Sequence, residues 1–335
     1  MRPVFIGGFL LYLFLSMILV YPVISSAAVH AKRLHDDLFS VSFADDKEGW
    51  ACGRWGTILH TKDGGKTWTN QKSGTDYTLS SIYFADAQHG WAVGDGGTIL
   101  HTDNGGDTWQ RQQSPVMYRL MSVHFVSANK GWAVGERTHI LTTSDGGKTW
   151  TKQFSDVDYI LKSVSFFDHS TGWAVGEYGY IYHTTNGGRT WENRGGGFRI
   201  VPETGDIEAG TFLFSIVATG PNTAMAVGID GYVAKTEDAG KTWQPIATGG
   251  PKTQMFCVAV GKNGNMILAG GSGVFLTSVN RGRNWKNADF RPSISYGWIY
   301  GLCRRGASGY VAVGWQGSIF LNEDGEGMVW KEIAY

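Results

Sequence analysis

Thr61-Lys62-Asp63-Gly64-Gly65-Lys66-Thr67-Trp68 is one copy of a motif that returns along almost the whole chain. Its pattern is Ser/Thr-x-Asp/Asn-x-Gly-x-Thr-Trp, in which the Asp or Asn can accept hydrogen bonds from backbone N–H groups of its own turn. Six good copies and one degenerate copy each end in a tryptophan; successive intervals are 41, 41, 41, 52, 42 and 45 residues. The closing tryptophans are Trp68, Trp109, Trp150, Trp191, Trp243, Trp285 and Trp330, and the acceptor positions are Asp63, Asn104, Asp145, Asn186, Asp238, Asn280 and Asp324.

A fixed period near 40 residues with several short strands per unit is typical of a propeller. Within residues 80–112, short apolar runs at 81–84, 91–94 and 97–102 are separated by turns rich in Gly, Asp or Asn, and a fourth run follows Trp109. We therefore predict an all-β protein, a seven-bladed β-propeller over residues 32–335 with four antiparallel strands per blade. The motif turn joins strands three and four, and residues 194–212 form an insertion between blades four and five.

The second strand of the first four units carries a further tryptophan in the sequence Gly-Trp-Ala-x-Gly. This ring suits an apolar slot between neighbouring sheets, but its indole N–H then needs a hydrogen-bond acceptor. Units five to seven place Met225, Ile267 and Val311 there instead. The four tryptophans are Trp50, Trp91, Trp132 and Trp173.

The composition gives no support for several classes of function. Lys plus Arg and Asp plus Glu are both 29, so the formal charge is zero and favours neither nucleic acid nor an acidic membrane surface. The cysteines, Cys52, Cys257 and Cys303, have no metal-ligand spacing; they are interpreted as buried free thiols, with a Cys257–Cys303 disulfide as the alternative. We expect no metal, no cofactor and a monomer.

The N-terminus is separate from the repeat. Residues 4–24 are without charge and follow Arg2, and the small residues at 25–28 suit cleavage by a signal peptidase. The same apolar run is long enough to span a bilayer, so residues 1–31 are predicted to be a signal peptide or an uncleaved membrane anchor. Either reading predicts export to a periplasm, or to a thylakoid lumen in a photosynthetic source.

The unit at 90–109 resembles the photosystem II stability/assembly factor family of exported Asp-box (BNR-type) seven-bladed propellers. The resemblance rests on Gly90-Trp91-Ala92-Val93-Gly94, on Gly97-Thr98-Ile99-Leu100-His101-Thr102 and on the motif turn that follows. It covers residues 36–335. It implies a non-enzymatic chaperone that binds a membrane subunit during assembly, partly through an arginine-rich patch whose positions we do not map onto this chain.

Candidate binding residues are those that differ between otherwise similar units. The loops between strands two and three and between strands four and one share one face of a propeller, and the former change charge and size from unit to unit. Blade seven adds aromatic and arginine residues beside the axis, a combination common in binding hot spots. The predicted partner-binding residues are Arg54, Trp55, Arg137, Tyr178, Arg199, Trp298, Arg304, Arg305 and Trp315. Ordinary drift at solvated turns is the alternative explanation of the variation.

An exported glycoside hydrolase is the rival hypothesis, because Asp-box propellers include sialidases and other glycosidases. Such an enzyme needs two carboxylates about 5–10 Å apart. Glu136 and Glu177, at corresponding positions of adjacent blades, are the first pair to test as acid and base. The acids of the motif turns are interpreted as structural, because they repeat in every blade.

Overall fold

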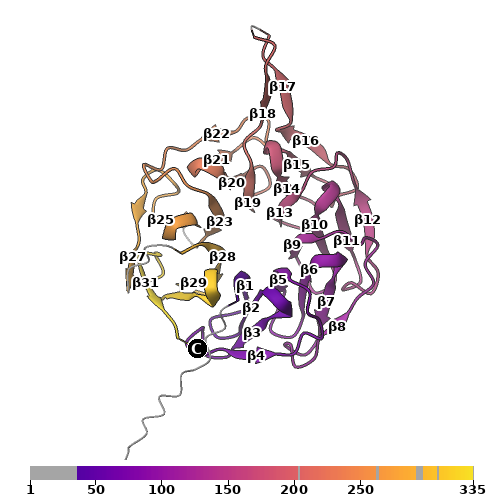
Figure 1. Ribbon diagram of the computed structural model, residues 1–335, viewed down its shortest axis with the longest axis vertical. Coiled ribbons are helices and arrows are strands. Elements are labelled where there is room, and N and C mark those ends of the chain that lie inside the picture. The colour runs from indigo at the N-terminus through magenta and orange to yellow at the C-terminus, as the bar shows by residue number, and fades with distance from the viewer. Residues whose placement is uncertain (1–35, 203, 262–263, 292–296, 308, 335) are drawn as a thin grey trace, which may run out of the picture. The chain divides into compact units, whose positions relative to one another are not determined.

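The computed structural model describes residues 36–202, 204–261, 264–291, 297–307 and 309–334 (Figure 1). Residues 32–335 form one compact unit, in which seven small sheets are arranged as a ring. The predicted signal peptide or anchor lies outside the described residues. Within these ranges, no helix is both long and apolar enough to cross a membrane.

Blades one to four follow the predicted order, with each blade built from one contiguous stretch of four antiparallel strands. The first strand lies nearest the axis and the fourth at the rim (Figure 1). Their bounds are β1 (Leu38–Phe43), β2 (Gly49–Gly53), β3 (Ile58–Thr61), β4 (Thr69–Gln71); β5 (Leu79–Phe84), β6 (Gly90–Gly94), β7 (Ile99–Thr102), β8 (Gln110–Arg111); β9 (Leu120–Phe125), β10 (Gly131–Gly135), β11 (Ile140–Thr143), β12 (Thr151–Phe154); β13 (Leu161–Phe166), β14 (Gly172–Gly176), β15 (Ile181–Thr184) and β16 (Glu192–Gly195).

The remaining chain adds three blades and two features that the repeat does not predict. The 194–212 insertion contains a hairpin, β17–β18, that extends outward from the ring (Figure 1). Blade seven gains a fifth strand, β27, which pairs in parallel with β31. The bounds are β17 (Phe198–Ile200), β18 (Ile207–Ala209); β19 (Leu213–Ala218), β20 (Ala224–Gly228), β21 (Val233–Thr236), β22 (Gln244–Pro245); β23 (Met255–Val260), β24 (Met266–Gly270), β25 (Phe275–Ser278), β26 (Lys286–Asn287); β27 (Asp289–Arg291), β28 (Ile299–Arg305), β29 (Gly309–Gly314), β30 (Ile319–Asn322) and β31 (Val329–Glu332).

The motif turns are held by their own acids, as the structural interpretation requires. Asp145 Oδ1 accepts the backbone N–H of Thr149 at 2.9 Å, and Oδ2 accepts its hydroxyl at 2.6 Å. These hydrogen bonds from Thr149 lower the pKa of Asp145 to about 2. Asn186 makes the equivalent bonds to Thr190, since its amide donates to the hydroxyl where the carboxylate would accept.

The strand-two tryptophans join each blade to the next one. The indole N–H of Trp132 donates to the carbonyl of Gly187, in the motif turn of blade four, at 3.2 Å. Gln153 Nε2 donates to the same carbonyl, and the Trp132 ring stacks on Phe166 with centroids 3.4 Å apart. Trp50 and Trp91 make the equivalent bonds to Gly105 and Gly146. For these three tryptophans the motif turn therefore supplies the acceptor that a buried indole requires.

The ring closes between blades seven and one by packing and a few hydrogen bonds. Val311, Val313 and Leu321 share a buried apolar cluster with blade-one residues, namely Leu38, Val41, Ala51, Leu59 and Trp68. In the described residues no strand is exchanged between these two blades, because blade one pairs only β1 to β4. Arg305 takes part directly: it is 6% exposed, and its Nη1 donates to the Gly64 carbonyl at 3.1 Å.

Candidate functional site

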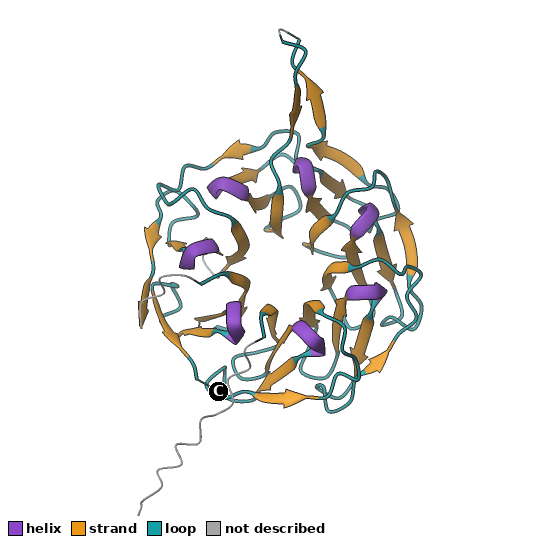
Figure 2. Cartoon of the chain, in the orientation of Figure 1, coloured by secondary structure: helices purple, strands orange, loops and turns teal. Residues whose placement is uncertain are grey.

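Within the described residues, seven short 3₁₀ turns lie on one face of the ring, which we call the mouth face (Figure 2). Each joins strands two and three, and its first N–H donates to the carbonyl of the residue before the innermost strand, as Asp95 does to Thr78 at 3.0 Å. The preceding glycine is needed for this approach, because a Cβ on Gly94 would meet that carbonyl oxygen at 1.9 Å. The turns are η1 (Arg54–Gly56), η2 (Asp95–Gly97), η3 (Glu136–Thr138), η4 (Glu177–Gly179), η5 (Ile229–Gly231), η7 (Gly271–Gly273) and η8 (Trp315–Gly317).

The central residue of every 3₁₀ turn has a left-handed backbone. In blade two this residue is Gly96, but in the other six turns a side chain is held at φ between 52° and 58°. A non-glycine residue in this conformation costs on the order of 1 kcal/mol or more and is common at binding sites. The six residues are Trp55, Arg137, Tyr178, Asp230, Ser272 and Gln316.

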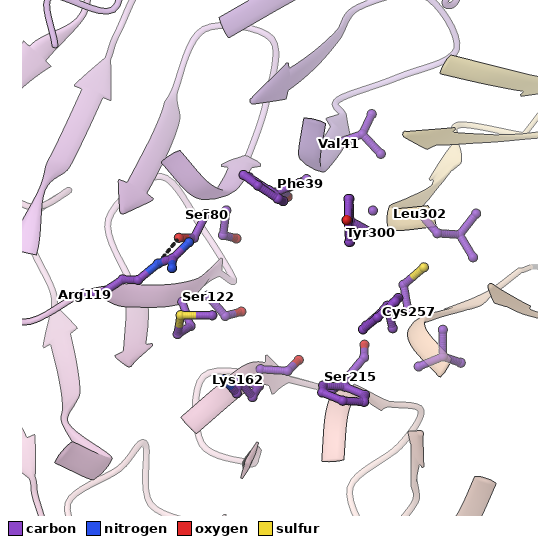
Figure 3. A pocket seen from close by; sticks show the side chains of 18 residues that line it. Phe39, Val41, Ser80, Arg119, Ser122, Lys162, Ser215, Cys257, Tyr300 and Leu302 are labelled. Carbon is purple, nitrogen blue, oxygen red and sulfur yellow. Dashed lines mark hydrogen bonds between the residues drawn. The ribbon is translucent and has the colours of Figure 1, made fainter. Parts of the chain in front are cut away.

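The innermost strands enclose a cavity of about 370 Å³ at the mouth face, which we call the mouth cavity (Figure 3). The residue at the second position of each inner strand lines this cavity, and a β-bulge lies next to that position in most blades. On one side these residues form a continuous aromatic arc. Ring centroids are 5.1 Å apart for Phe214–Phe256, 5.6 Å for Phe256–Tyr300 and 5.3 Å for Tyr300–Phe39. Trp298 extends the arc, 5.7 Å from Phe256.

The opposite side of the mouth cavity is more polar, and carries Ser80 and Lys162, with Met121 between them, at the same strand position. Arg119 Nε donates to Ser80 Oγ at 3.1 Å and pairs with Asp95 at 3.0 Å (Figure 3). The two cations that line the mouth cavity, Arg119 and Lys162, are each paired with a carboxylate, and the arc is the apolar part of the cavity. Lys162 lies 3.5 Å from Glu177, and two further ion pairs at this face are Arg54–Asp37 at 3.0 Å and Arg137–Asp158 at 3.7 Å.

A ring of small polar residues lies one position deeper and is explained by the fold. Ser81 Oγ accepts the backbone N–H of Val123 at 3.3 Å, and Ser122 accepts that of Val164 at 3.3 Å. Ser163 makes the corresponding contact to Ile216. Since these hydroxyls join the inner strands of adjacent blades, the second-position ring is the part of the cavity left for a ligand.

The structure gathers only part of the predicted surface. Arg54, Trp298 and Trp315 lie on blades one and seven at the mouth face: Arg54 lies 6.0 Å from the Phe39 ring, and Trp315 N donates to the Trp298 carbonyl. Trp55 is exposed on the neighbouring turn η1. The two further turn residues lie on other blades, where Arg137 stacks on Tyr118 at 4.3 Å and Tyr178 packs against Phe198 and Phe212.

Three predicted arginines lie away from this group. The sequence places Arg304 and Arg305 with Trp298, but β28 carries them to its opposite end. Arg304 lies four residues beyond Tyr300, roughly 13 Å along the strand at ordinary strand rise. Burial and the bond to Gly64 assign Arg305 to ring closure instead of a free surface. Arg199 lies in β17 of the outer hairpin, and its side chain lies outside the described structure.

The aromatic cavity residues absent from the predicted binding set are Phe39, Phe214, Phe256 and Tyr300, and on the opposite side the set also lacks Ser80, Arg119, Met121 and Lys162. The signal was available in the repeats, because the second position of the inner strand changes between aromatic, polar and cationic residues from blade to blade. The β-bulge hid this signal. It turns the side chain at the second position toward the axis, whereas the simple alternation of side chains along a strand does not predict that direction.

Glu136 and Glu177, the candidate glycosidase pair, make the same contact in adjacent blades. Glu136 Oε2 accepts the backbone N–H of Arg119 at 3.2 Å, and Glu177 Oε2 accepts that of Ile160 at 3.1 Å. Each carboxylate thus binds the backbone directly before the inner strand of its own blade. None of the residues that line the mouth cavity is Asp or Glu, so this cavity lacks the two carboxylates that glycoside hydrolysis uses.

The thiols do not form an oxidised or metal-binding site. All three cysteines are free, and Cys52 and Cys257 are buried as interpreted from the sequence, whereas Cys303 is only partly buried. Desolvation nevertheless raises the pKa of Cys303 to about 12. Burial raises the pKa values of Cys52 and Cys257 still further. Among the described residues, no three His, Cys, Asp or Glu side chains are grouped as they would be around a metal ion.

Comparison with known proteins places this geometry in a family. The family model for the photosynthesis system II assembly factor YCF48 matches residues 27–114 and 111–334, which is most of the chain. The chain belongs to the YCF48 family. Among curated proteins no match is found.

Solved structures of two YCF48 proteins share the fold. One, described as YCF48 bound to D1 peptide, is 19% identical with a TM-score of 0.69, over 85% of this chain and 91% of that one. YCF48 from Cyanidioschyzon merolae is 19% identical with a TM-score of 0.67, over 85% and 95%. The GH74 xyloglucanase from Xanthomonas campestris is also similar, with 14% identity and a TM-score of 0.69, but only 54% of that chain is covered. At these identities the likeness concerns the fold.

Proposed function

We propose that this YCF48-family chain is a non-enzymatic assembly module whose mouth cavity binds a segment of a membrane protein subunit. The observation that carries the proposal is the aromatic arc formed by Phe214, Phe256, Tyr300 and Phe39 at the opening of a cavity without carboxylates. A bound D1 peptide in a related propeller supports a peptide as ligand.

The size and chemistry of the mouth cavity favour a side chain over a sugar chain. About 370 Å³ lies near the lower limit for small-molecule pockets and suits one or two large apolar side chains. Aromatic walls on rigid inner strands provide contact area at a small entropic cost. The charged pairs at the rim, among them Arg54–Asp37, then surround the apolar contact and can bond the backbone of an extended peptide.

We further propose that the chain acts outside the cytoplasm, either cleaved after residue 28 or anchored through residues 4–24. This location is where the loops and tails of a membrane subunit would be accessible on the exoplasmic side. Fractionation of cells that express the full chain tests it, because a protein found only in the cytoplasm would contradict the proposal.

The binding site is tested by co-purification from solubilised membranes. Phe256→Ala and Trp298→Ala remove parts of the arc, and we expect each to reduce recovery of a membrane subunit about tenfold, as for hot-spot aromatics. Phe167→Ala is the matched control, because Phe167 is 47% exposed and Trp298 is 48% exposed, yet Phe167 lies just beyond the other end of its inner strand, which ends at Phe166. Unchanged recovery with both arc variants would overturn the assignment.

A further inference from the structure

The second cavity of interest lies on the opposite face of the ring, among the motif turns, which we call the Asp-box face. It has a volume of about 510 Å³ and lies between blades three and four. Lys130, His169 and Arg189 line it, and its other side chains are Thr, Ser, Gln and Asn. None of the lining residues is acidic.

The 41-residue repeat provides an internal comparison for this cavity. The equivalent cavity between blades two and three is lined by Asp103, Asp145 and Lys148, together with two histidines and Arg111. One repeat later, Asp103 and Asp145 become Ser144 and Asn186. The cavity between blades three and four has therefore lost two acids while keeping a cation, Arg189, at the position of Lys148.

A third acid is lost beside the new cation. In blade two, Asp86 pairs with His89 at 3.0 Å. In blade three these positions are Ser127 and Lys130. Lysine is a stronger base than the histidine of blade two, and serine replaces the acid that pairs with it there. Among the described residues, neither Lys130 nor Arg189 has a carboxylate within ion-pair distance.

The surroundings of Lys130 fix its ammonium group at the cavity. Nζ donates to Thr142 Oγ1 at 2.8 Å and to Ser144 Oγ at 3.4 Å, and it lies 4.7 Å from the centroid of the Trp132 ring. Burial and the neighbouring Arg189 lower the pKa of Lys130. The nearest acid on the facing turn, Asp168, already accepts the backbone N–H groups of residues 170 and 171.

We propose that this cavity is an anion-binding site that holds one oxyanion group, a carboxylate or a phosphate, between Lys130 and Arg189. A guanidinium binds either group through two parallel N–H donors, and an ammonium adds a point charge from the other side. The hydroxyl of Ser144 can add a further donor, whereas the hydroxyl of Thr142 donates to the Gly131 carbonyl at 3.0 Å and serves to position Lys130. The site is separate from the mouth cavity and does not depend on the proposed peptide binding.

The indole N–H signal of Trp132 is a direct reporter in the ¹⁵N-tryptophan-labelled protein, since this indole lies beneath Lys130 and donates to the cavity residue Gly187. We expect a saturable shift on addition of inorganic phosphate or of acetate at constant ionic strength. A stronger response to phosphate identifies a tetrahedral anion as the ligand, and one at least as strong to acetate identifies a carboxylate. The Trp91 indole, which donates to Gly146 in the acid-containing cavity, is the internal control and should not move.

Asn186→Asp restores the consensus acid and keeps the turn intact, because Asp145 makes the same turn bonds. We expect it to weaken anion binding about tenfold or more by placing a negative charge in the cavity. Lys130→Met should abolish the shift, and Lys148→Ala, at the position of Arg189, should leave it unchanged. A Trp132 signal that does not respond to either anion, or responds equally in Asn186→Asp, overturns the proposal, as does an equal shift of Trp91.

Discussion

Replacing Trp132 and Trp173 by Phe, one at a time, separates the hydrogen bond of the inter-blade tryptophan from its packing. Both side chains are 0% exposed, so both replacements remove similar apolar area. Trp132 donates to Gly187, whereas the Trp173 indole has no acceptor among the described residues. The turn that faces Trp173 carries Ala239 where the other three faced turns carry glycine.

The expected difference in stability between the two variants follows from the hydrogen bonding of the two indole N–H groups. Trp132→Phe loses a satisfied hydrogen bond worth about 1 kcal/mol, although Gln153 still satisfies the Gly187 carbonyl. Trp173→Phe removes a buried unsatisfied donor, which offsets its packing loss by about 1 kcal/mol or more. Trp132→Phe should therefore be the more destabilising by roughly 2 kcal/mol. For a domain of about 300 residues this corresponds to about 3 °C in Tm.

The assay is calorimetric or urea unfolding of both variants beside Trp91→Phe. Trp91→Phe should lose as much stability as Trp132→Phe, because the Trp91 indole also donates to a glycine carbonyl, at 3.1 Å. Equal losses for Trp132→Phe and Trp173→Phe, or the reverse order, would refute the view that the motif turns stabilise the ring as hydrogen-bond acceptors for the indoles.

Three further predictions concern the described contacts. The pKa of Asp145 is depressed, so its stabilisation is complete above the unfolded pKa of about 4 and is lost as pH falls toward 2; Tm should fall less between pH 5 and pH 2.5 in Asp145→Asn than in the wild type. Arg305→Met should destabilise the ring by roughly 2 kcal/mol in urea, since it loses a buried charged donor, and an unchanged midpoint would exclude a role in closure. Because Cys52 and Cys257 are buried and burial raises their pKa values, a thiol reagent should label neither of them in native protein and both after denaturation; rapid native labelling of either would contradict the buried positions.

The fold could be predicted because its determinants are local and repeated. Asp63 and Trp68 act within eight residues, so a single copy of the motif already defines its turn. The parallel strand β27 was missed since residues 289–291 pair with 329–331, and no repeat marks so distant a contact. The role of Arg305 in ring closure was missed for the same reason, because its acceptor, Gly64, lies near the other end of the sequence.

The candidate site could be predicted only in outline. Trp298 and the variable turns were found from differences between units, and the structure connects Trp298 to the aromatic arc. Phe39 and Phe256 lie far apart in the chain and become a single surface only when the ring brings their blades around the axis. Glu136 looked equally variable, but its carboxylate is used by its own blade.

Site-specific photo-cross-linking tests the central claim, that the aromatic arc at the mouth face contacts a membrane subunit. The benzophenone amino acid p-benzoylphenylalanine replaces Trp298 in one protein and Phe167, on the opposite face, in another, and each is irradiated with native membranes. We expect the Trp298 position to yield a cross-link to one segment of a membrane protein, identified by mass spectrometry, and the Phe167 position to yield none. Cross-linking of that segment from Phe167 but not from Trp298 would contradict binding at the aromatic arc.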